Sequence, residues 1–439
     1  MARKLPDPET AEIVDTTVDG RGIARPPGKT VFINGALTGE TVRFQRRKKR
    51  RSYDEADLLE ILKPAPERVE PKCAAFGICG GCSLQHLASA RQLEMKQGVL
   101  LDNLQRIGHV EPAAVLEPIG GSAWGYRRKA RLAVKYVTKK ERVLVGFRER
   151  NKPYVADMAR CETLHPALGD RLLDLAALIE SLSIRGRVPQ IEAAVGDNGV
   201  AMVFRVLDPP SPSDLAALAR FGATHGVGIY LQSKGPDTIE PLPGAPAPVP
   251  LHYRIPGFDI SIAFTATDFL QVHSEVNGKM IQNALQLLAP DRSSRVLDLY
   301  CGLGNFSLPI ATRAGEVVGV ELAADMVARA GRNAAHNQIA NASFRQADLS
   351  APAPADAAEW RGFDLVMLDP PRTGAMEMME VLGQIGAQRI VYVSCHPGTL
   401  ARDAGHLVHA LGYELAAAGV MDMFPQTSHV ESMALFRRA

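Results

Sequence analysis

RVLDLYCGLGNFSLPIA, residues 295–311, decides the fold of this chain. A strand-like segment runs into a turn that holds Gly302 and Gly304, and a helix-like pattern follows. Glycines at such a turn let backbone N–H groups approach a ligand closely, as in dinucleotide-binding folds. Apolar strands alternate with helix-like segments from here to the carboxyl terminus, and this alternation predicts a doubly wound, Rossmann-like parallel sheet of the α/β class over residues 258–439.

Two further domains are expected before this one. Residues 1–66 alternate apolar and polar positions between glycine turns, which predicts a small all-β barrel. Residues 67–257 mix strand-like and helical patterns and predict an α+β domain, although part of residues 93–120 is expected to pack with the carboxyl-terminal domain. Seven prolines in residues 235–257 indicate a semi-rigid connector or an extended edge segment at the boundary.

The amino terminus, MARKLPDPETAE, carries charges and prolines where a secretory signal would need an apolar stretch. No run of about eighteen apolar residues, the length of a membrane span, occurs in the sequence. We therefore expect a cytoplasmic protein with no membrane segment. In that reducing compartment, clustered cysteines indicate metal or cluster ligands, or catalysis, rather than disulfides.

Positive charge is unevenly placed along the chain, although the net charge is only +2. Residues 43–51, RFQRRKKRR, hold seven cations in nine positions, and residues 127–150 hold ten cations against Glu141 and Glu149. Such density suits contacts with phosphates, and the alternative for each run is a solvated face or a flexible loop. Two separate runs favour RNA as a partner.

Two acidic residues follow the glycine turn at strand ends. Glu321 closes the next strand, where a carboxylate can bind ribose hydroxyls, and Asp348 closes the third strand, near the expected position of an adenine amino group. Each acid alone is also a common helix N-cap, but together they predict an adenosine ligand. The turn lacks a third glycine and the lysine of a P-loop. S-adenosylmethionine, which has no phosphates, therefore fits better than NAD or ATP.

The fourth and fifth strands end in chemistry-bearing residues. Asp369-Pro370-Pro371-Arg372 lies where ligands bind in this fold, and Arg372 stands where methylases of exocyclic amino groups usually have a stacking aromatic residue. Cys395, in VYVSCHP, ends the fifth strand. The alternatives for this thiol are a buried structural cysteine and a nucleophile, and its position at a strand end favours the nucleophile.

Methylation at carbon 5 of a pyrimidine is a reaction that would need a thiolate at this position. Addition of sulfur to carbon 6 makes an enolate whose carbon 5 can attack a methyl sulfonium, and a base must then remove the proton from carbon 5. Glu431, in TSHVESMALF, is the candidate base, and His429, expected on the same face of that strand, is its rival. A surface carboxylate on an edge strand is the alternative for Glu431.

Three cysteines, Cys73, Cys79 and Cys82, form the spacing C-x5-C-x2-C. Three thiolates call for a fourth ligand, and the candidates in the sequence are Cys161, Cys301, Cys395 and His86. Four such ligands suit zinc or an iron–sulfur cluster equally well.

Taken in order, the motifs resemble those of the RNA uracil-5-methyltransferase family, and most closely its iron–sulfur type that acts on 23S ribosomal RNA. The resemblance covers nearly the whole chain. It starts with a segment similar to a TRAM RNA-binding (OB-like) barrel, DGRGIARPPGKTVFINGALTGE. The motifs that follow are CAAFGICGGCSLQH, FLQVHSEVN, DLYCGLGNFSLP, LDPPR, SCHP and HVES.

The resemblance implies S-adenosylmethionine-dependent methylation of carbon 5 of one uridine, number 1939 of 23S rRNA, which is flipped out of its structure into the Cys395 site. It implies Cys395 as nucleophile, Glu431 as base and Asp369 as an active-site carboxylate near the uracil. The residues implied for S-adenosylmethionine, beside the loop glycine, are Gln271, Tyr300, Gly302, Glu321, Asp348 and Asp369. The ligands implied for a [4Fe-4S] cluster are Cys73, Cys79, Cys82 and Cys161.

One position departs from the family pattern, because members usually carry Asn where this chain has His273. The polar contacts beside Gln271 are therefore expected to differ. We expect a monomer in which the cluster has a structural or RNA-positioning role. The alternative functions are the same chemistry on another rRNA or tRNA uridine, and a non-enzymatic, cluster-bearing RNA-binding protein.

Overall fold

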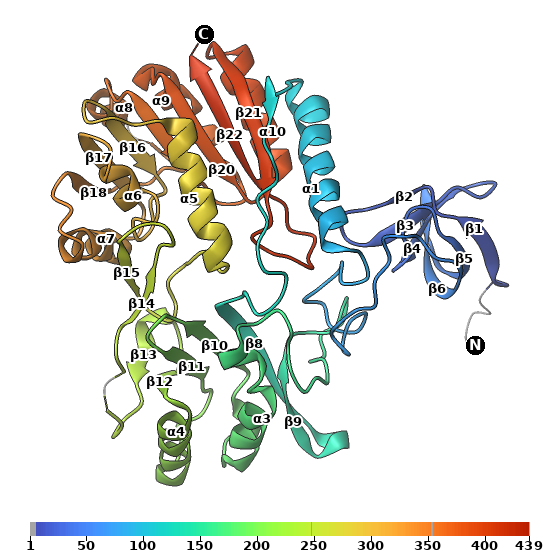
Figure 1. Ribbon diagram of the computed structural model, residues 1–439. Coiled ribbons are helices and arrows are strands. Elements are labelled where there is room, and N and C mark those ends of the chain that lie inside the picture. The colour runs from blue at the N-terminus through green and yellow to red at the C-terminus, as the bar shows by residue number, and fades with distance from the viewer. Residues whose placement is uncertain (1–5, 247, 353, 439) are drawn as a thin grey trace.

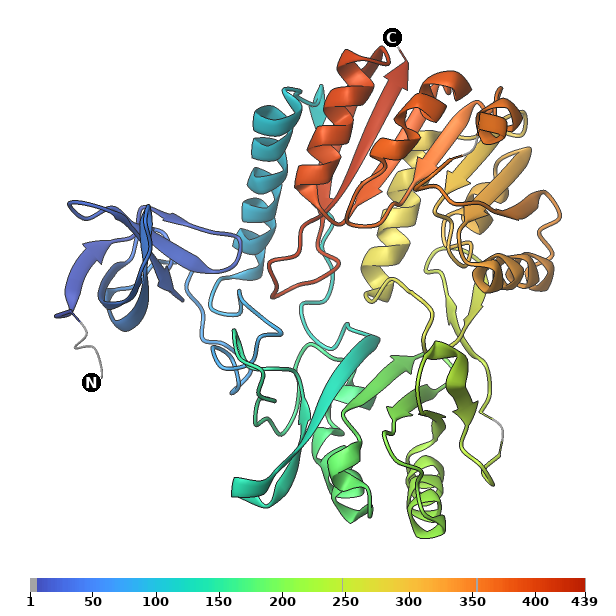
Figure 2. The same ribbon diagram turned by 180° about the vertical axis from the view of Figure 1, so that it is seen from behind.

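A computed structural model describes residues 6–246, 248–352 and 354–438 of the 439-residue chain. The start of the expected first domain, residues 1–5, and the end of the last, residue 439, lie outside the described residues. Figures 1 and 2 show a small sheet unit beside a long helix, a central sheet with helices beneath it, and a large α/β sheet above. No helix in the described ranges has the length and apolar character that a membrane crossing requires.

The amino-terminal unit is a six-stranded sheet in the order β1-β5-β6-β4-β3-β2. Its edge strands β1 and β2 are separated in the chain only by Ile13 and Val14, and the core of the unit includes Val31 and Phe44. The basic residues 43–51 lie on β5 and on its turn into β6. The strands are β1 Glu9–Glu12, β2 Asp15–Thr16, β3 Arg21–Ala24, β4 Thr30–Asn34, β5 Thr41–Lys49 and β6 Tyr53–Lys63.

The central unit is a second six-stranded sheet, in the order β13-β12-β11-β10-β8-β9. Its apolar face packs against helices α2, α3 and α4. The strands are β8 Lys129–Val137, β9 Arg142–Gly146, β10 Gln190–Val195, β11 Val200–Arg205, β12 Val227–Gln232 and β13 Ile239–Pro241. The helices are α2 Pro166–Gly169, α3 Leu172–Ser181 and α4 Pro212–His225. A hairpin of β14 Leu251–Arg254 and β15 Ser261–Phe264 then leads into the last unit.

The carboxyl-terminal unit is an eight-stranded sheet in the order β18-β17-β16-β19-β20-β22-β21-β7. The expected α/β class is confirmed, and β16 to β20 are parallel, but β22 runs antiparallel to both β20 and β21. The strands are β16 Arg295–Leu299, β17 Glu316–Glu321, β18 Ala342–Gln346, β19 Leu365–Leu368, β20 Arg389–Ser394, β21 Tyr413–Met421 and β22 Glu431–Arg438.

Helices cover both faces of this sheet. Residues of α5, α6 and α7 join the core on one face, and residues of α1, α9 and α10 join the core on the other. The helices are α5 Ser274–Leu288, α6 Ser307–Ala311, α7 Ala324–His336, α8 Pro354–Glu359, α9 Met379–Ile385 and α10 Pro397–His409.

Two elements of this unit come from much earlier in the chain. Helix α1 (Ser89–Asn103), continued by a π-helical turn at Leu104–Gly108, packs against α10 and β21. Strand β7 (Ala114–Val115) pairs in parallel with β21 and forms the sheet edge. The chain thus enters the carboxyl-terminal unit, leaves it to build the central sheet, and returns.

Candidate functional site

The candidate site lies at the carboxyl-terminal edge of the parallel strands. Tyr300 and Gly302 follow β16, Glu321 is the last residue of β17, and Asp369 and Cys395 directly follow β19 and β20. The ends of parallel strands meet at one edge of a sheet, where ligands bind in this class of fold. These five sequence-predicted residues therefore share one edge of the sheet.

The loop after β16 is held in an unusual backbone conformation. Tyr300, Gly302 and Gly304 have φ angles of 65°, 55° and 90°. Residues other than glycine rarely adopt this backbone region. The Gly302 N–H donates to Glu321 Oε2 over 3.2 Å, and the Ala323 N–H donates to Oε1 of the same side chain over 3.1 Å. Glu321 is thereby fixed against the glycine loop.

Three carboxylates influence one another at this edge. Burial, with the charges of Asp369 and Glu321 added, raises the pKa of Asp298 to about 7, although Ser307 donates a hydrogen bond to it. Burial also raises the pKa of Asp369 to about 7, against a hydrogen bond from Gln271. Asp298 Oδ1 is buried without a partner among the described residues. A ligand with a sulfonium and an ammonium group suits such a concentration of negative charge.

Gln271 and Asp348 occupy different settings. Gln271, from the segment before α5, donates from Nε2 to Asp369 Oδ2 over 3.3 Å and so belongs to the carboxylate group. Asp348 lies two residues beyond β18, is exposed, and accepts bonds from the N–H and hydroxyl of Ser350. Its local hydrogen bonds hold its pKa below the usual value. Its charge is one of the causes that raise the pKa of Tyr300, in the glycine loop.

His273 is the N-cap of α5 rather than a partner of Gln271. Its Nδ1 accepts from the Val276 N–H, its Nε2 contacts the Ser122 carbonyl over 3.0 Å, and its ring stacks on Tyr126 at 4.8 Å. Asn is also a favoured N-cap residue. His273 thus caps α5 and adds an aromatic contact at this position.

Cys395 and Glu431 are neighbours across β20 and β22. Ser394 and Ser432 are register partners, Cys395 follows the first of them, and Glu431 precedes the second. Burial, and then the charge of Asp369, raise the pKa of Glu431 to about 8, while the cations of Arg372 and Lys96 oppose that shift. Burial and the charge of Glu431 also raise the pKa of Cys395. The thiol and the carboxyl group are thus both held mainly in their protonated forms at neutral pH.

The sequence pattern suggested that His429 lies on the last strand. In the structure it does not, because β22 begins only at Glu431. It belongs to the loop before that strand, where Arg372 Nη2 approaches its Nδ1 at 3.0 Å. Burial and the cations of Arg372 and Arg127 lower the pKa of His429 to about 4. The imidazole is therefore neutral at physiological pH and in contact with a guanidinium group.

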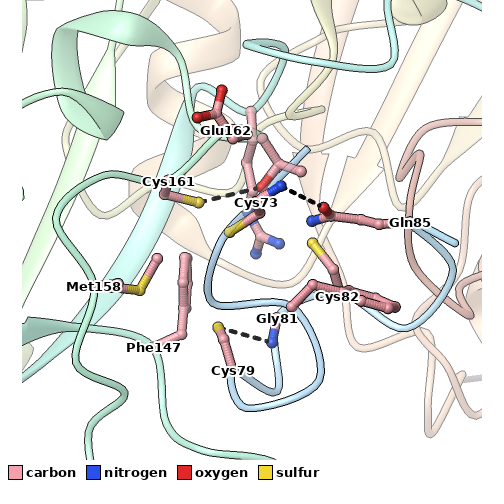
Figure 3. A pocket seen from close by; sticks show the side chains of 12 residues that line it. Cys73, Cys79, Gly81, Cys82, Gln85, Phe147, Met158, Cys161 and Glu162 are labelled. Atoms are coloured by element: carbon pink, nitrogen blue, oxygen red, sulfur yellow. Dashed lines mark hydrogen bonds between the residues drawn. The ribbon is translucent and has the colours of Figure 1, made fainter. Parts of the chain in front are cut away.

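Four cysteines line a second cavity, in the central part of the molecule. Figure 3 shows the sulfur atoms of Cys73, Cys79, Cys82 and Cys161 directed into one space, with Phe147 and Met158 on its wall. Burial raises the pKa of Cys79 to about 11 and that of Cys82 to about 12. Within the described ranges, no three side chains of His, Cys, Asp or Glu are close enough to share one metal ion.

The other candidates for a fourth ligand lie elsewhere. Cys301 is buried beside Gly319 of β17, and Cys395 stands at the methyl-transfer edge. His86 is buried next to Phe76, does not line the cysteine cavity, and has no hydrogen-bond partner on either ring nitrogen among the described residues. Of the four candidates, the cavity therefore contains Cys161 alone.

Sequence reasoning missed one charged residue of the site, Lys96. Its ammonium group is fully buried and donates to Asp422 Oδ1 over 2.7 Å, in the loop that leads to Glu431. Gln92, Lys96 and Leu100 are the buried residues of α1, and their spacing of four was the only available signal. A polar face on a helix does not reveal that it will meet a loop more than three hundred residues away.

The chain matches proteins of one family over its full length. A family model described as tRNA (Uracil-5-)-methyltransferase matches residues 252–439. The "23S rRNA (uracil(1939)-C(5))-methyltransferase RlmD" of Stenotrophomonas maltophilia is 51% identical over 98% of this chain and 97% of its own length. The protein of the same name from Alkalilimnicola ehrlichii is 52% identical over 99% of this chain and 98% of its own length.

A solved structure shares the whole fold. The tRNA (uracil-54, C5)-methyltransferase of Pyrococcus abyssi, solved with S-adenosyl-L-homocysteine, aligns with a TM-score of 0.75 over 98% of this chain and 100% of its own, at 24% identity. That likeness concerns the fold, whereas the identity to the full-length relatives concerns the family. The chain belongs to the family of 23S rRNA (uracil-C5)-methyltransferases named RlmD.

Proposed function

We propose that this protein methylates carbon 5 of uridine 1939 in 23S rRNA with S-adenosylmethionine as methyl donor. The observation that carries the proposal is the pair of Cys395 and Glu431. They are neighbours at the same edge of the sheet as the glycine loop that follows β16. A nucleophile and a base within reach of one ring are what addition at carbon 6 and proton removal at carbon 5 require. The names of the full-length relatives supply the RNA and the uridine number.

S-adenosylmethionine supplies a methyl group bound to a positively charged sulfur. The Cys395 thiolate adds to carbon 6 of the uracil, and the electron pair of the ring double bond passes to the carbonyl at carbon 4. Carbon 5 of the resulting enolate then bonds to the methyl carbon while the bond between that carbon and the sulfonium sulfur breaks, and S-adenosylhomocysteine leaves as a neutral thioether. The Glu431 carboxylate removes the proton from carbon 5, and the electron pair of that C–H bond expels the Cys395 thiolate. The enzyme is left with a free thiolate at Cys395 and a protonated carboxyl group at Glu431.

The surrounding residues have binding roles in this proposal. Asp369 accepts from Gln271 and its charge acts on both Glu431 and Cys395, so a carboxyl group with a pKa near 7 is available here to donate to or accept from the uracil. Arg372, whose charge lowers the pKa values of Cys395 and Glu431, is placed to favour negative charge on the ring. The proposed contacts of S-adenosylmethionine are Gln271, Tyr300, Gly302, Glu321, Asp348 and Asp369.

We assign the cysteine cavity to a [4Fe-4S] cluster held by Cys73, Cys79, Cys82 and Cys161. The support is the chemistry of the donor set, four thiols around one space, of which Cys79 and Cys161 are buried and Cys73 and Cys82 are half-buried. In such a cluster each thiolate binds a different iron, so the four sulfurs need not meet at a single ion. The cluster would hold the segment around it in place, since all four irons would be ligated by protein.

The barrel and the basic residues would bind the RNA backbone. We identify the amino-terminal sheet as a TRAM domain, and its hairpin carries Lys48 and Lys49, which have no ion-pair partner among the described residues. Contacts to phosphates fix the register of the RNA without reading its sequence. The target uridine would leave its stack to reach Cys395. A ribosomal RNA substrate fits the cytoplasmic, monomeric protein expected from the sequence.

The test is methyl transfer from labelled S-adenosylmethionine to 23S rRNA transcripts. We expect one 5-methyluridine, at position 1939, and none when that uridine is replaced by cytidine. Label at another uridine would overturn the choice of target. No label in any transcript, with a protein that binds S-adenosylmethionine, would overturn the reaction.

A further inference from the structure

The loop that precedes the proposed base is held almost entirely by residues from the first third of the chain. Residues 422–430, here called the base loop, join β21 to β22 and end directly before Glu431. Figures 1 and 2 both show this loop below the sheet, beside the amino-terminal end of α1. Met421, just before the loop, is the register partner of Glu431. Because Glu431 directly follows the loop at the start of β22, the position of the base loop sets the backbone that leads into this residue.

Two polar side chains of α1 hold the base loop. Lys96 Nζ donates to Asp422 Oδ1 over 2.7 Å and to the Phe424 carbonyl over 3.2 Å. Gln92 Nε2 donates to Gln426 Oε1 over 3.0 Å, and Gln92 Oε1 accepts from the Gln426 N–H over 3.0 Å. All these side chains are buried.

The segment that follows the cysteine motif adds a third attachment. The N–H groups of Ser83 and Leu84 both donate to the Gln426 carbonyl, over 2.9 and 3.1 Å. Gln92 Nε2 also donates to the Leu84 carbonyl over 3.0 Å, so the helix, the cysteine segment and the base loop form one hydrogen-bonded unit. Ser83, which donates to the base loop, is the residue directly after Cys82. The cysteine motif and this hydrogen bond are therefore adjacent in the chain.

The backbone at the centre of this unit is in a disfavoured conformation. Gln426 has a φ angle of 70°, which a residue with a side chain adopts only where its surroundings over-determine it. Its N–H, carbonyl and side chain are all bonded to residues outside the loop. Burial of a charged pair such as Lys96 and Asp422 is also a poor source of stability compared with apolar packing, and its best-attested use is to fix one arrangement.

We propose that Gln92 and Lys96 are positioning residues for the base step: they hold the base loop so that Glu431 stands beside Cys395. The inference rests on the proposed function, because it assigns a role within that reaction. Neither residue touches the uracil. Their loss is expected to spare the addition and methyl-transfer steps, which use Cys395 directly after β20, and to slow proton removal by Glu431.

The helix itself offers a matched control. Gln97 lies on α1 like Gln92 and makes bonds of the same kind, accepting from the Val420 N–H over 3.0 Å and donating to the Leu116 carbonyl over 3.2 Å. Its partners belong to β21 and to the segment after β7, not to the base loop. A Gln97→Leu variant thus reports what general loosening of α1 does.

The experiment compares Gln92→Leu and the double variant Lys96→Met/Asp422→Asn with Gln97→Leu and the unaltered protein. The double variant removes both buried charges together and nearly keeps the shapes of the side chains, so no unpaired charge is left in the interior. Each protein reacts with a 23S rRNA fragment and S-adenosylmethionine in a single turnover, and is then denatured. Covalent RNA–protein adduct and released 5-methyluridine are measured, along with the rate of trapping on 5-fluorouridine RNA.

Gln92→Leu and Lys96→Met/Asp422→Asn, here called the clamp variants, are expected to trap 5-fluorouridine RNA within about twofold of the unaltered protein. Release of 5-methyluridine should slow by roughly tenfold to a hundredfold, with methylated adduct accumulating on ordinary RNA, because small misplacements of a catalytic group have effects of this size. Gln97→Leu should show no accumulation. Gln92→Leu changes no charge and so tests positioning alone, whereas the double variant also removes the Lys96 cation that lowers the pKa of Glu431 and supports the inference only if its release stays slow at high pH.

Release at the unaltered rate in the folded clamp variants would overturn the inference. So would a parallel loss of trapping and release, since that would indicate general destabilisation and not a defect of the base step. If the unaltered protein forms neither adduct nor 5-methyluridine, the proposed function itself fails, and this result is distinguishable from the other two.

Discussion

The ionisation of Glu431 gives the sharpest quantitative expectation for the reaction. Its pKa is raised to about 8, first by burial and then by the charge of Asp369, while Arg372 and Lys96 act in the opposite direction. Only the carboxylate form can take the proton from carbon 5. The rate of proton removal must therefore rise with pH until Glu431 is fully ionised.

The size of the rise follows from that pKa. A group with a pKa of about 8 is ionised in about a tenth of the molecules at pH 7 and in about nine-tenths at pH 9, so proton removal should accelerate about tenfold over this range. Replacement of Asp369 by Asn removes a charge that raises the pKa, and the rising limb should move to lower pH. Burial remains the main cause, so the limb should stay above the ordinary value of 4.5.

The assay must separate this step from the addition of Cys395, whose pKa is also raised. Methylated adduct is formed at one pH, the pH is jumped, and the decay of adduct into free 5-methyluridine RNA is followed by rapid quenching and denaturing gels. A Glu431→Gln variant should retain the adduct at every pH. Decay that does not change between pH 7 and pH 9, or that proceeds normally in Glu431→Gln, would refute the assignment of the base.

Three further predictions concern stability, the cysteine cavity and RNA binding. The folded-state pKa of Glu431 is raised, so its ionisation removes stability as pH rises from about 4.5 through 8. Glu431→Gln should therefore be more stable than the unaltered protein by up to about 3 kcal/mol at pH 7, and about equally stable at pH 4. Urea unfolding at the two pH values measures this difference. Cys161→Ala should lose bound iron and its visible absorption while Cys301→Ala keeps both; equal iron in the two variants would contradict the ligand assignment. Replacement of Lys48 and Lys49 by Ala should weaken binding to 23S rRNA fragments and lower the slope of log affinity against log salt by up to about 2, and an unchanged slope would remove this hairpin from the interface.

Much of the carboxyl-terminal unit could be predicted from the sequence because its signals are local. Strand and helix patterns alternate clearly, and a residue that directly follows a parallel strand must lie at the ligand edge whatever the details of packing. This reasoning placed Glu321, Asp369 and Cys395 at one edge of the sheet, where the structure also has them, whereas Tyr300 was expected only from the family resemblance.

The remaining features depend on contacts between distant segments. The position of His429 before β22, and its contact with Arg372, follow from where an antiparallel strand begins, which its sequence pattern does not fix. The buried charge of Lys96 is explained only by Asp422, far away in the chain. The basic hairpin is also less cationic than its composition suggests, because Arg46 is paired with carboxylates of the same sheet.

The most direct test of the central claim uses 23S rRNA fragments that carry 5-fluorouridine. Fluorine at carbon 5 cannot leave as a proton does, so an enzyme that adds a thiol to carbon 6 stalls as a covalent adduct after methyl transfer. We predict an adduct that survives denaturation, maps to position 1939 and is absent in Cys395→Ala. Methylation of ordinary RNA without any trapped adduct would contradict the account, and the roles of both Cys395 and Glu431 would then have to be abandoned.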